Sequence, residues 1–271
     1  MMLNRNFKNF KFHHIRKKNQ IIYRSQKIKD DSEIINLIDN FLKEKNSFIF
    51  ESVEKGKIRG RYTIFGKNPD KIWEFNNKNS YLIKNKIKKK IKGNPDKIIE
   101  KIIEEFEFKT PKDLPPICSL ISGYFSYDSI RYVEKIPNTC RDDLKLPDVR
   151  LLRPRTLIIH DNLKKKIFYI INIFKDEKIR SYKKKYLRIE KEINSLLIQA
   201  SHCPVKPDVY KKKSIKVKSN ITKNKFLDMV NKAKNYIKIG DIFQVVLSQR
   251  FEAKLSKKPL DIYKKLRVTN P

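Results

Sequence analysis

The chain has 271 residues, 39% of them hydrophobic and 11% aromatic, which is enough to bury a sizeable core and to fill about two domains. This composition excludes a disordered chain. The longest apolar run, residues 167–174, contains Asn172 and is less than half of the ~20 residues that a membrane-spanning helix needs, so we expect no membrane partner.

Charge is the most unusual property of the sequence. It holds 64 Lys and Arg against 30 Asp and Glu, a formal net charge of +34. A polyanion such as nucleic acid is one possible partner. However, the densest run, residues 84–92, holds six lysines with no Arg and no aromatic residue that could stack on bases. Because Lys, Ile and Asn share A/T-rich codons, we attribute the excess to genome composition and expect no nucleic-acid partner.

The cysteines Cys118, Cys140 and Cys203 are widely spaced and form no C-x-x-C motif, which suits a reducing compartment. We therefore expect a cytoplasmic protein. The pair His202-Cys203, with His160 as a distant third ligand, matches no zinc pattern. We interpret these as ordinary loop residues and expect no metal site in this chain.

In chain order, residues 1–31 form a basic segment whose first 29 residues carry no acid. Apolar residues at helical spacing then predict a helix over residues 31–43 and a second one over 96–106. Short runs rich in β-branched and aromatic residues predict antiparallel strands between these helices, at residues 47–53, 61–66, 73–75 and 80–84.

A Pro-rich stretch leads into a strand-like region around Gly123, residues 117–127. Residues 157–160 and 166–174 predict a hairpin, and the next helix is predicted over residues 175–200.

Residues 201–221, rich in Lys and Pro, are predicted to be a linker. A new unit follows it. Thr222 is a candidate N-cap for a helix that Gly240 ends. A strong strand is then predicted over residues 242–251, and a short helix over residues 259–267.

No standard catalytic template is present, since the six glycines form neither G-x-G-x-x-G nor a P-loop and no G-x-S-x-G occurs. One cluster does suit a ligand. Glu51-Ser52 ends a strand, and Arg59 and Arg61 follow. A carboxylate and a hydroxyl can hold an ammonium group while an arginine holds a carboxylate, so the set fits an amino acid. A strand end with surface arginines is the alternative interpretation.

Two further clusters are open to a structural or a ligand-binding interpretation. Residues 123–134 form an aromatic-dense turn in which we expect Arg131 to bond a carboxylate or a loop carbonyl. In residues 240–251, Gln244, Ser248 and Arg250 give an otherwise apolar strand one polar face. We expect the polar side chains on that face to contact either a ligand or solvent.

Five ordered blocks resemble the large subunit of anthranilate synthase. They are FESVEKGKIRGRYTIFG (50–66), SGYFSYDSIRYVE (122–134), LPDVRLL (146–152) with LIIHDNL (157–163), IKIGDIFQVVLSQRF (237–251) and LRVTNP (266–271). Aminodeoxychorismate synthase component I shares the architecture. The sequences VVLS at 245–248 and Glu-Ser at 51–52 fit anthranilate synthase better.

The resemblance implies an α+β fold of interleaved antiparallel β-sheets with flanking helices, whose C-terminal domain is incomplete in this chain. It divides the sequence into an N-terminal basic segment (1–31), a regulatory domain (32–200), a linker (201–221) and the start of a chorismate-utilising domain (222–271).

The resemblance also implies a lyase reaction of tryptophan biosynthesis, in which chorismate and ammonia give anthranilate and pyruvate. The ammonia comes from a glutamine amidotransferase subunit, Mg²⁺ is required, and L-tryptophan inhibits at a remote site. The family's metal-binding glutamates and most chorismate contacts lie downstream of Pro271. We therefore expect no catalytic residues here and no synthase activity from this chain alone.

Carried over residue by residue, Glu51 and Ser52 match the positions that hold tryptophan, with Arg59 or Arg61 as further candidates. Asn270-Pro271 begins the family's second tryptophan-contacting segment. Two alternatives stay open, namely aminodeoxychorismate synthase component I and a non-catalytic basic binding module. Because unpaired strand edges invite aggregation, we also expect the isolated segment to be poorly soluble.

Overall fold

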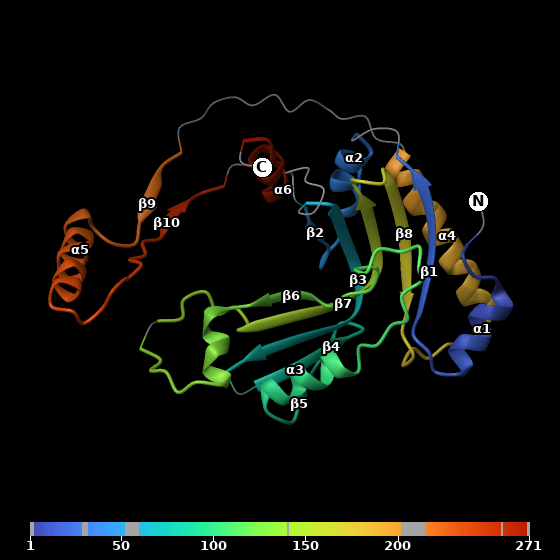
Figure 1. The fold of residues 1–271 in the computed structure, drawn as a ribbon, viewed down its shortest axis with the longest axis horizontal. Coiled ribbons are helices and arrows are strands. Elements are labelled where there is room, and N and C mark those ends of the chain that lie inside the picture. The colour runs from blue at the N-terminus through green and yellow to red at the C-terminus, as the bar shows by residue number, and fades with distance from the viewer. Residues whose placement is uncertain are drawn as a thin grey trace. The chain divides into compact units, whose positions relative to one another are not determined.

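The computed structural model describes residues 3–28, 32–51, 60–77, 79–139, 141–201, 215–255 and 257–269 (Figure 1). The chain divides into two compact units, Met1–Val205 and Lys206–Pro271. Each unit is described by itself. Within the described residues, no helix is long and apolar enough to cross a membrane.

The first unit contains mixed helices and strands. In chain order they are α1 (Phe7–Ile15), β1 (Gln20–Lys27), α2 (Ser32–Phe41), β2 (Phe48–Phe50), β3 (Tyr62–Asn76), β4 (Asn79–Lys84), β5 (Ile87–Ile91), α3 (Pro95–Glu104), β6 (Ser122–Phe125), the 3-10 helix η1 (Tyr127–Tyr132), β7 (Val149–Asp161), β8 (Lys166–Ile173) and α4 (Tyr182–Ser201). This confirms the predicted α+β class.

The strands join in one antiparallel sheet, with the order β1-β8-β7-β3-β4-β5, to which β2 adds beside β3 and β6 beside β7. The two longest strands change direction at a shared irregularity. Pro69 of β3 faces Pro154 of β7, and the register shifts between Pro69 and Lys71. Because proline lacks the N–H that a central strand donates, the two prolines interrupt both hydrogen-bond ladders at one level.

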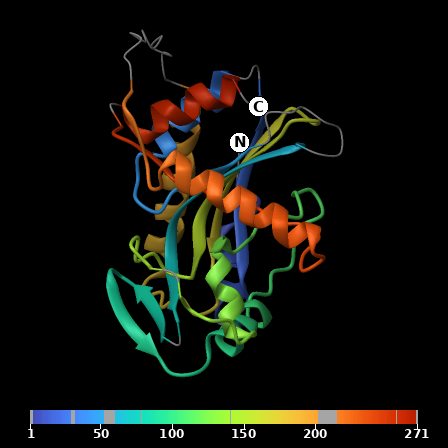
Figure 2. The ribbon, with the colours of Figure 1, turned by 90° about the vertical axis from the view of Figure 1, so that its left-hand side faces the viewer.

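This bend divides the sheet into two halves that share β3 and β7 (Figures 1 and 2). The first half-sheet has the order β2-β3-β7-β8-β1 and the second has the order β5-β4-β3-β7-β6. Figure 2 shows the β4–β5 hairpin at the lower end of the second half-sheet.

Apolar side chains cover both faces of the first half-sheet. On one face, Leu157 and Phe168 pack with Leu114 and Cys118 from the segment that follows α3. On the other, α4 lies against β8 and contacts α1 and α2, which contribute the fully buried Phe10 and Phe41, respectively. In the second half-sheet α3 covers a smaller core, whose buried members are Trp73, Phe75, Ile102, Val149 and Leu151.

Two sequence expectations for this unit need adjustment. The strands predicted at 61–66 and 73–75 are one continuous strand, β3, because the bend accommodates Pro69 without ending it. The basic segment 1–31 contributes both a helix and a strand. Asn6 caps α1 by accepting from the Asn9 N–H, and β1 pairs with β8 along its whole length.

The second unit contains β9 (Val217–Ser219), α5 (Lys223–Lys238), β10 (Phe251–Ala253) and α6 (Pro259–Thr269). The predicted caps of α5 are confirmed, since Thr222 accepts from the Lys225 N–H and Gly240 has a φ of +85°. The strand predicted over 242–251 is wrong, because residues 242–250 have no regular structure and Phe243 is fully exposed. Among the described residues, only β9 pairs with the short strand β10, and no described strand pairs with the apolar residues before it.

Candidate ligand-binding site

The residues predicted to hold an amino acid lie where β2 ends and β3 begins. β2 pairs with β3 so that Phe50 faces Ile64, and Phe48 faces Gly66. The Phe48 ring lies so close to Gly66 that a Cβ there would overlap it. Glu51 follows β2 and is half-buried. Glu51 and the start of β3 therefore lie at the same end of this strand pair.

Arg61, the residue before β3, is held by the β7–β8 turn. Its Nε donates to Asp161 Oδ1 at 3.0 Å and its Nη2 donates to Oδ2 at 2.7 Å. The Asp161 side chain is 3% exposed, and its Oδ1 also accepts from the N–H groups of Leu163 and Lys164 at 3.1 Å. The Asn162 N–H completes the junction by donating to the Arg61 carbonyl at 2.8 Å.

This junction fixes the ionisation of its carboxylate. Burial alone would raise the pKa of Asp161. The Arg61 hydrogen bonds and charge and the two backbone N–H groups outweigh burial and hold that pKa below its ordinary value. A bidentate arginine that already has a carboxylate partner is a poor competitor for a ligand's carboxylate. The geometry thus supports the alternative interpretation of Arg61, as a clamp on the strand end, and its contact with tryptophan remains a prediction.

The other predicted tryptophan contacts lie outside the described residues. They are Ser52, Arg59, Asn270 and Pro271. The same holds for Cys140, His202 and Cys203, while Cys118 is a free, buried thiol.

The aromatic-dense turn at 123–134 is held together as its structural interpretation predicted. Arg131 Nε donates to Asp128 Oδ1 at 2.9 Å, and Arg131 Nη1 donates to the carbonyls of Ile136 and Pro137 at 2.6 and 2.9 Å. Tyr132 donates to Asp148 Oδ2 at 3.0 Å. Burial, followed by this hydrogen bond and the charge of the carboxylate, raises the pKa of Tyr132.

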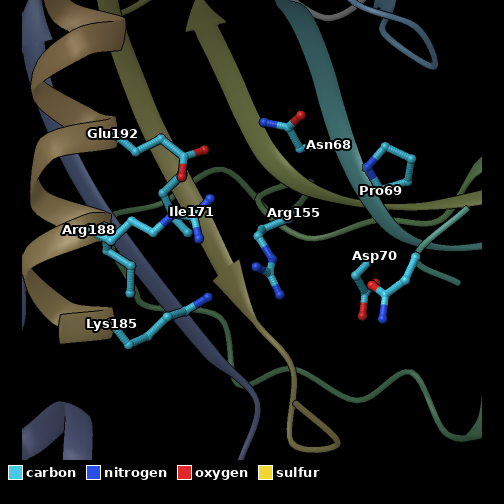
Figure 3. Close-up of a pocket in the computed structure, with 10 residues that line it drawn as sticks. Asn68, Pro69, Asp70, Arg155, Ile171, Lys185, Arg188 and Glu192 are labelled. Atoms are coloured by element: carbon cyan, nitrogen blue, oxygen red, sulfur yellow. The ribbon is translucent and has the colours of Figure 1, made fainter. Parts of the chain in front are cut away.

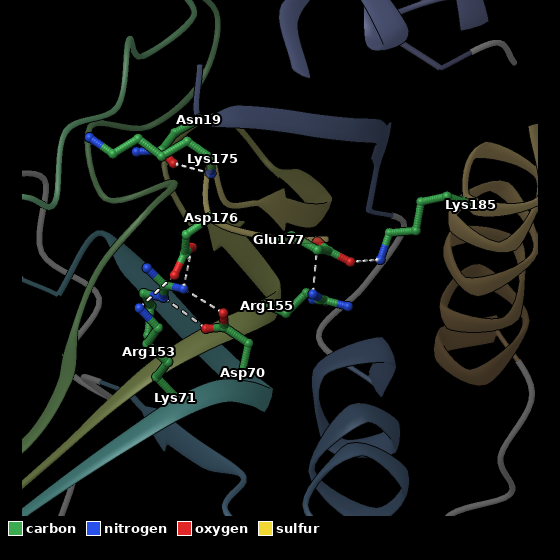
Figure 4. A network of polar contacts seen from close by, with 9 residues as sticks. All are labelled: Asn19, Asp70, Lys71, Arg153, Arg155, Lys175, Asp176, Glu177 and Lys185. Atoms are coloured by element: carbon green, nitrogen blue, oxygen red, sulfur yellow. Dashed lines mark hydrogen bonds and ion pairs between the residues drawn. The ribbon is translucent and has the colours of Figure 1, made fainter. Parts of the chain in front are cut away.

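Sequence reasoning missed an ion network at the bend of the sheet (Figure 4). Arg153 of β7 forms a bidentate pair with Asp70, at 2.8 and 2.5 Å, and reaches Asp176 at 2.9 Å. Lys71 pairs with Asp176 at 2.5 Å. Burial alone would raise the pKa of Asp176, but Lys71 and Arg153 lower it to about 2. The adjacent Pro69 and Pro154 were the only sequence signal of a special backbone here.

A cavity of about 330 Å³ lies beside this network, between α4 and the bend (Figure 3). Arg155 and Lys185 line it and share one carboxylate, since Glu177 lies 2.8 Å from Arg155 Nη2 and 2.5 Å from Lys185 Nζ. Burial, reinforced by the charge of Arg155, lowers the pKa of Lys185. Glu192, also in the lining, accepts from Thr156 Oγ1 at 2.7 Å. These bonds tie α4 to the sheet, which is a structural role.

The part of the chain that the structure describes has no group of three His, Cys, Asp or Glu side chains that could hold a metal ion. In the second unit, Gln249 donates to Ser219 Oγ at 2.7 Å and Arg250 pairs with Glu252 at 3.0 Å. Two members of the polar set in 240–251, Gln244 and Ser248, are exposed. The described geometry therefore places Glu51 and Arg61 at the same end of the β2–β3 pair, and whether they bind a ligand remains a prediction.

Comparisons with known proteins agree on one family. A family model described as chorismate binding enzyme matches residues 46–271. The anthranilate synthase component 1 of Acetivibrio thermocellus is 38% identical over 242 residues, covering 88% of this chain and 49% of the relative. That of Cereibacter sphaeroides is 31% identical over 259 residues, covering 93% and 52%.

A solved structure gives the same result. The crystal structure of anthranilate synthase component I from Streptococcus pneumoniae TIGR4 matches with a TM-score of 0.64 at 28% identity, covering 85% of this chain and 49% of that one. The chain therefore spans about half the length of the relatives that it matches.

Proposed function

The chain belongs to the chorismate-binding enzyme family, and we propose that it is the regulatory part of the large subunit of an anthranilate synthase. The match over residues 46–271, with relatives of that name at 38% and 31% identity, carries the proposal. The whole protein would convert chorismate and ammonia to anthranilate and pyruvate. Its ammonia would come from a glutamine amidotransferase subunit, the component II partner.

For regulation, we propose that L-tryptophan binds at the end of β2, with Glu51 paired to its ammonium group and the Ser52 hydroxyl bonded to it. The half-burial of Glu51 supports this, because a partly desolvated carboxylate attracts an ammonium group more strongly than an exposed one. The Arg61–Asp161 clamp supports it as well, since it fixes the strand that follows the site. A fixed frame lowers the entropy cost of binding.

Inhibition then requires that this site and the chorismate site favour different states of the enzyme. Tryptophan lowers activity only by the difference between its affinities for those states. We propose that the bond from Ser52 is made in the inhibited state.

We propose that the residues that react with chorismate lie outside the described residues. The family's Mg²⁺ finds no fitting set of three ligands among them, so we derive no step through the metal. We propose instead that the metal ligands and most chorismate contacts belong to the remainder of the whole protein. Synthase activity from the 271-residue chain, given chorismate, Mg²⁺ and ammonia, would refute this.

The decisive experiment is to extend the reading frame beyond codon 271 and to assay the complete gene product. We expect anthranilate, followed by its fluorescence, from chorismate, Mg²⁺ and ammonia. Aminodeoxychorismate as the product would instead identify the related synthase. A product of neither kind, together with salt-dependent DNA binding at physiological ionic strength, would favour a basic binding module.

The compartment is also a proposal. The buried free thiol of Cys118 suits a reducing compartment, and we propose the cytoplasm. Plant relatives from Arabidopsis thaliana and Oryza sativa are described as chloroplastic. Localisation of the tagged full-length protein tests the point.

A further inference from the structure

Four segments of the first unit meet around a basic cavity of about 350 Å³. They are the segment before α1, the end of α1 with its turn to β1, the stretch after α3 and the residues that follow β8. We call this cavity the N-terminal basic pocket. Its charged lining consists of the cations Arg5, Lys17, Lys18, Lys109 and Lys175 and the single carboxylate Glu107.

The cations of this pocket lack the partners that other cations of the same unit have. At the bend, Lys71, Arg153 and Lys185 each pair with a carboxylate. Among the described residues, by contrast, no carboxylate forms an ion pair with any of the five pocket cations. Among the described residues, the Arg5 guanidinium makes a long hydrogen bond of 3.5 Å, from Nη1 to Gln20 Oε1, while the Arg5 carbonyl accepts from the Tyr186 hydroxyl at 2.8 Å. Gathering unpaired like charges around one concavity destabilises the fold unless an anion compensates them.

The pocket is held in shape by one amide side chain. Asn19 Nδ2 donates to the Glu107 carbonyl at 2.5 Å, and Asn19 Oδ1 accepts from the Lys175 N–H at 2.7 Å. Figure 4 shows Asn19 beside Lys175. Asn19 thereby joins three of the four segments. The backbone of these three segments is therefore held together, which reduces the ordering that a ligand must impose.

The pKa of His13 reflects the positive potential of the pocket. His13 lines the pocket and is half-buried. Burial lowers the pKa of His13, and the charges of Arg5, Lys18 and Arg16 lower it further. The imidazole is therefore neutral at pH 7, where it can donate one hydrogen bond without adding to the charge.

We propose that the N-terminal basic pocket binds a compact multivalent anion of the phosphate type, carried by a small phosphorylated molecule. Four of its five cations are lysines, whose point charges suit the tetrahedral oxygens of a phosphate from several directions. A planar carboxylate favours bidentate arginine, and Arg5 is the only one here. The volume is that of a small-molecule site. A single-stranded nucleic acid would need an extended groove with aromatic rings on which its bases stack.

Thermal unfolding of the 271-residue chain at micromolar concentration tests the proposal, with pyrophosphate as the probe and NaCl at equal ionic strength as the reference. A ligand that binds only the folded state raises its stability. At a concentration tenfold above Kd, we expect a rise in Tm of roughly 3–5 °C over the NaCl reference.

Two double variants of equal charge loss separate the site from general screening. Lys18→Gln/Lys109→Gln removes two exposed pocket cations, and we expect it to lose most of the shift. Lys89→Gln/Lys90→Gln removes two exposed lysines of β5 and should keep it. The Tm of each variant in NaCl checks that it folds.

Three outcomes would overturn the proposal. They are no shift in the parent chain, an equal shift in both double variants, and stabilisation by a single-stranded oligonucleotide but not by pyrophosphate. The first two would leave the pocket without a specific anion, and the third would assign it to a polymer. None of them bears on the synthase proposal, because that proposal depends on the product of the complete gene.

Discussion

Replacing Arg153 by leucine should destabilise the first unit more than the loss of any exposed charge, because Arg153 holds the bend of the sheet. Its guanidinium pairs with Asp70 at two points, reaches Asp176 at 2.9 Å and lies 3.8 Å from the centre of the Phe174 ring. After the substitution, Asp176 keeps its pair with Lys71. Asp70 is left without its bidentate partner, and its carboxylate is largely buried.

The magnitude follows from burial. Removing one partner of a buried ion pair costs about 3–5 kcal/mol. The side chains of Arg153 and Asp70 are 12% and 14% exposed, which places this pair near the lower end of that range. The lost contact with the Phe174 ring contributes about 0.5–1 kcal/mol. We therefore expect the free energy of unfolding to fall by roughly 3.5–4 kcal/mol in total.

Urea unfolding followed by tryptophan fluorescence measures this change, because Trp73 is the only tryptophan and is buried in β3. Lys97→Gln is the matched control, since it removes a cation from an exposed pair with Glu100 and should leave the urea midpoint almost unchanged. Adding Asp70→Asn to the leucine variant should recover about 1–2 kcal/mol, as the stranded charge disappears. If Arg153→Leu costs no more than Lys97→Gln, the bend network does not stabilise the fold.

Three other predictions use the same unit or the proposed site. Gly123→Ala should destabilise by at least about 2 kcal/mol in urea, because its Cβ would overlap the Arg150 carbonyl across the β6–β7 pair; an unchanged midpoint would contradict that packing. Asp161 and Asp176 have folded pKa values below their ordinary 3.8, about 2 for Asp176, so their contribution is full above about pH 5 and is lost as the pH falls toward 2. Urea midpoints that stay constant from pH 5 to pH 2.5 would exclude it. In the full-length enzyme, Ser52→Ala should weaken tryptophan inhibition by about 5- to 150-fold, from a loss of about 1–3 kcal/mol, with little change in turnover; an equal loss of both would remove Ser52 from the inhibitor site.

The helices and short strands of the first unit could be predicted because their apolar spacing records which face is buried. The bend could not. A proline inside an apolar run ordinarily marks the end of a strand. Because of Pro69, two separate strands were therefore predicted where the structure has the single strand β3. Only the pairing partner shows why the strand continues, because Pro154 stands opposite and both ladders are interrupted at the same level. The pairing of the two prolines is a property of both strands together, and it cannot be predicted from either segment alone.

The opposite error arose at residues 242–251, where a strong apolar pattern predicted a strand that the structure does not contain. A strand is stable only when neighbours pair with it, and the sequence of the segment does not state whether they are present. In the N-terminal segment, by contrast, a weak apolar pattern is followed by a fully paired strand. Few apolar residues of α1 point inward, mainly Phe10, yet β1 is paired along its length because β8 offers an edge.

The candidate site shows the same division. The position of Glu51 at the end of a strand could be predicted, because it depends only on the neighbouring residues in the sequence. The commitment of Arg61 to Asp161 could not be predicted, because the two residues are 100 positions apart and only the β3–β7 pairing joins them.

The lysine excess leads to one more step. By sequence, the strongest candidate for a phosphate-binding patch is the run at residues 84–92, and in the structure it spans the β4–β5 turn and the largely exposed strand β5. The N-terminal basic pocket contains no comparable run, since its cations come from four separate segments. The pocket lysines are exposed as well, but they surround one concavity, so a single anion there would lie near all of them at once. Composition therefore accounts for how many lysines the chain has, but the fold decides where their repulsion accumulates, and an anion is the simplest means of relieving it there.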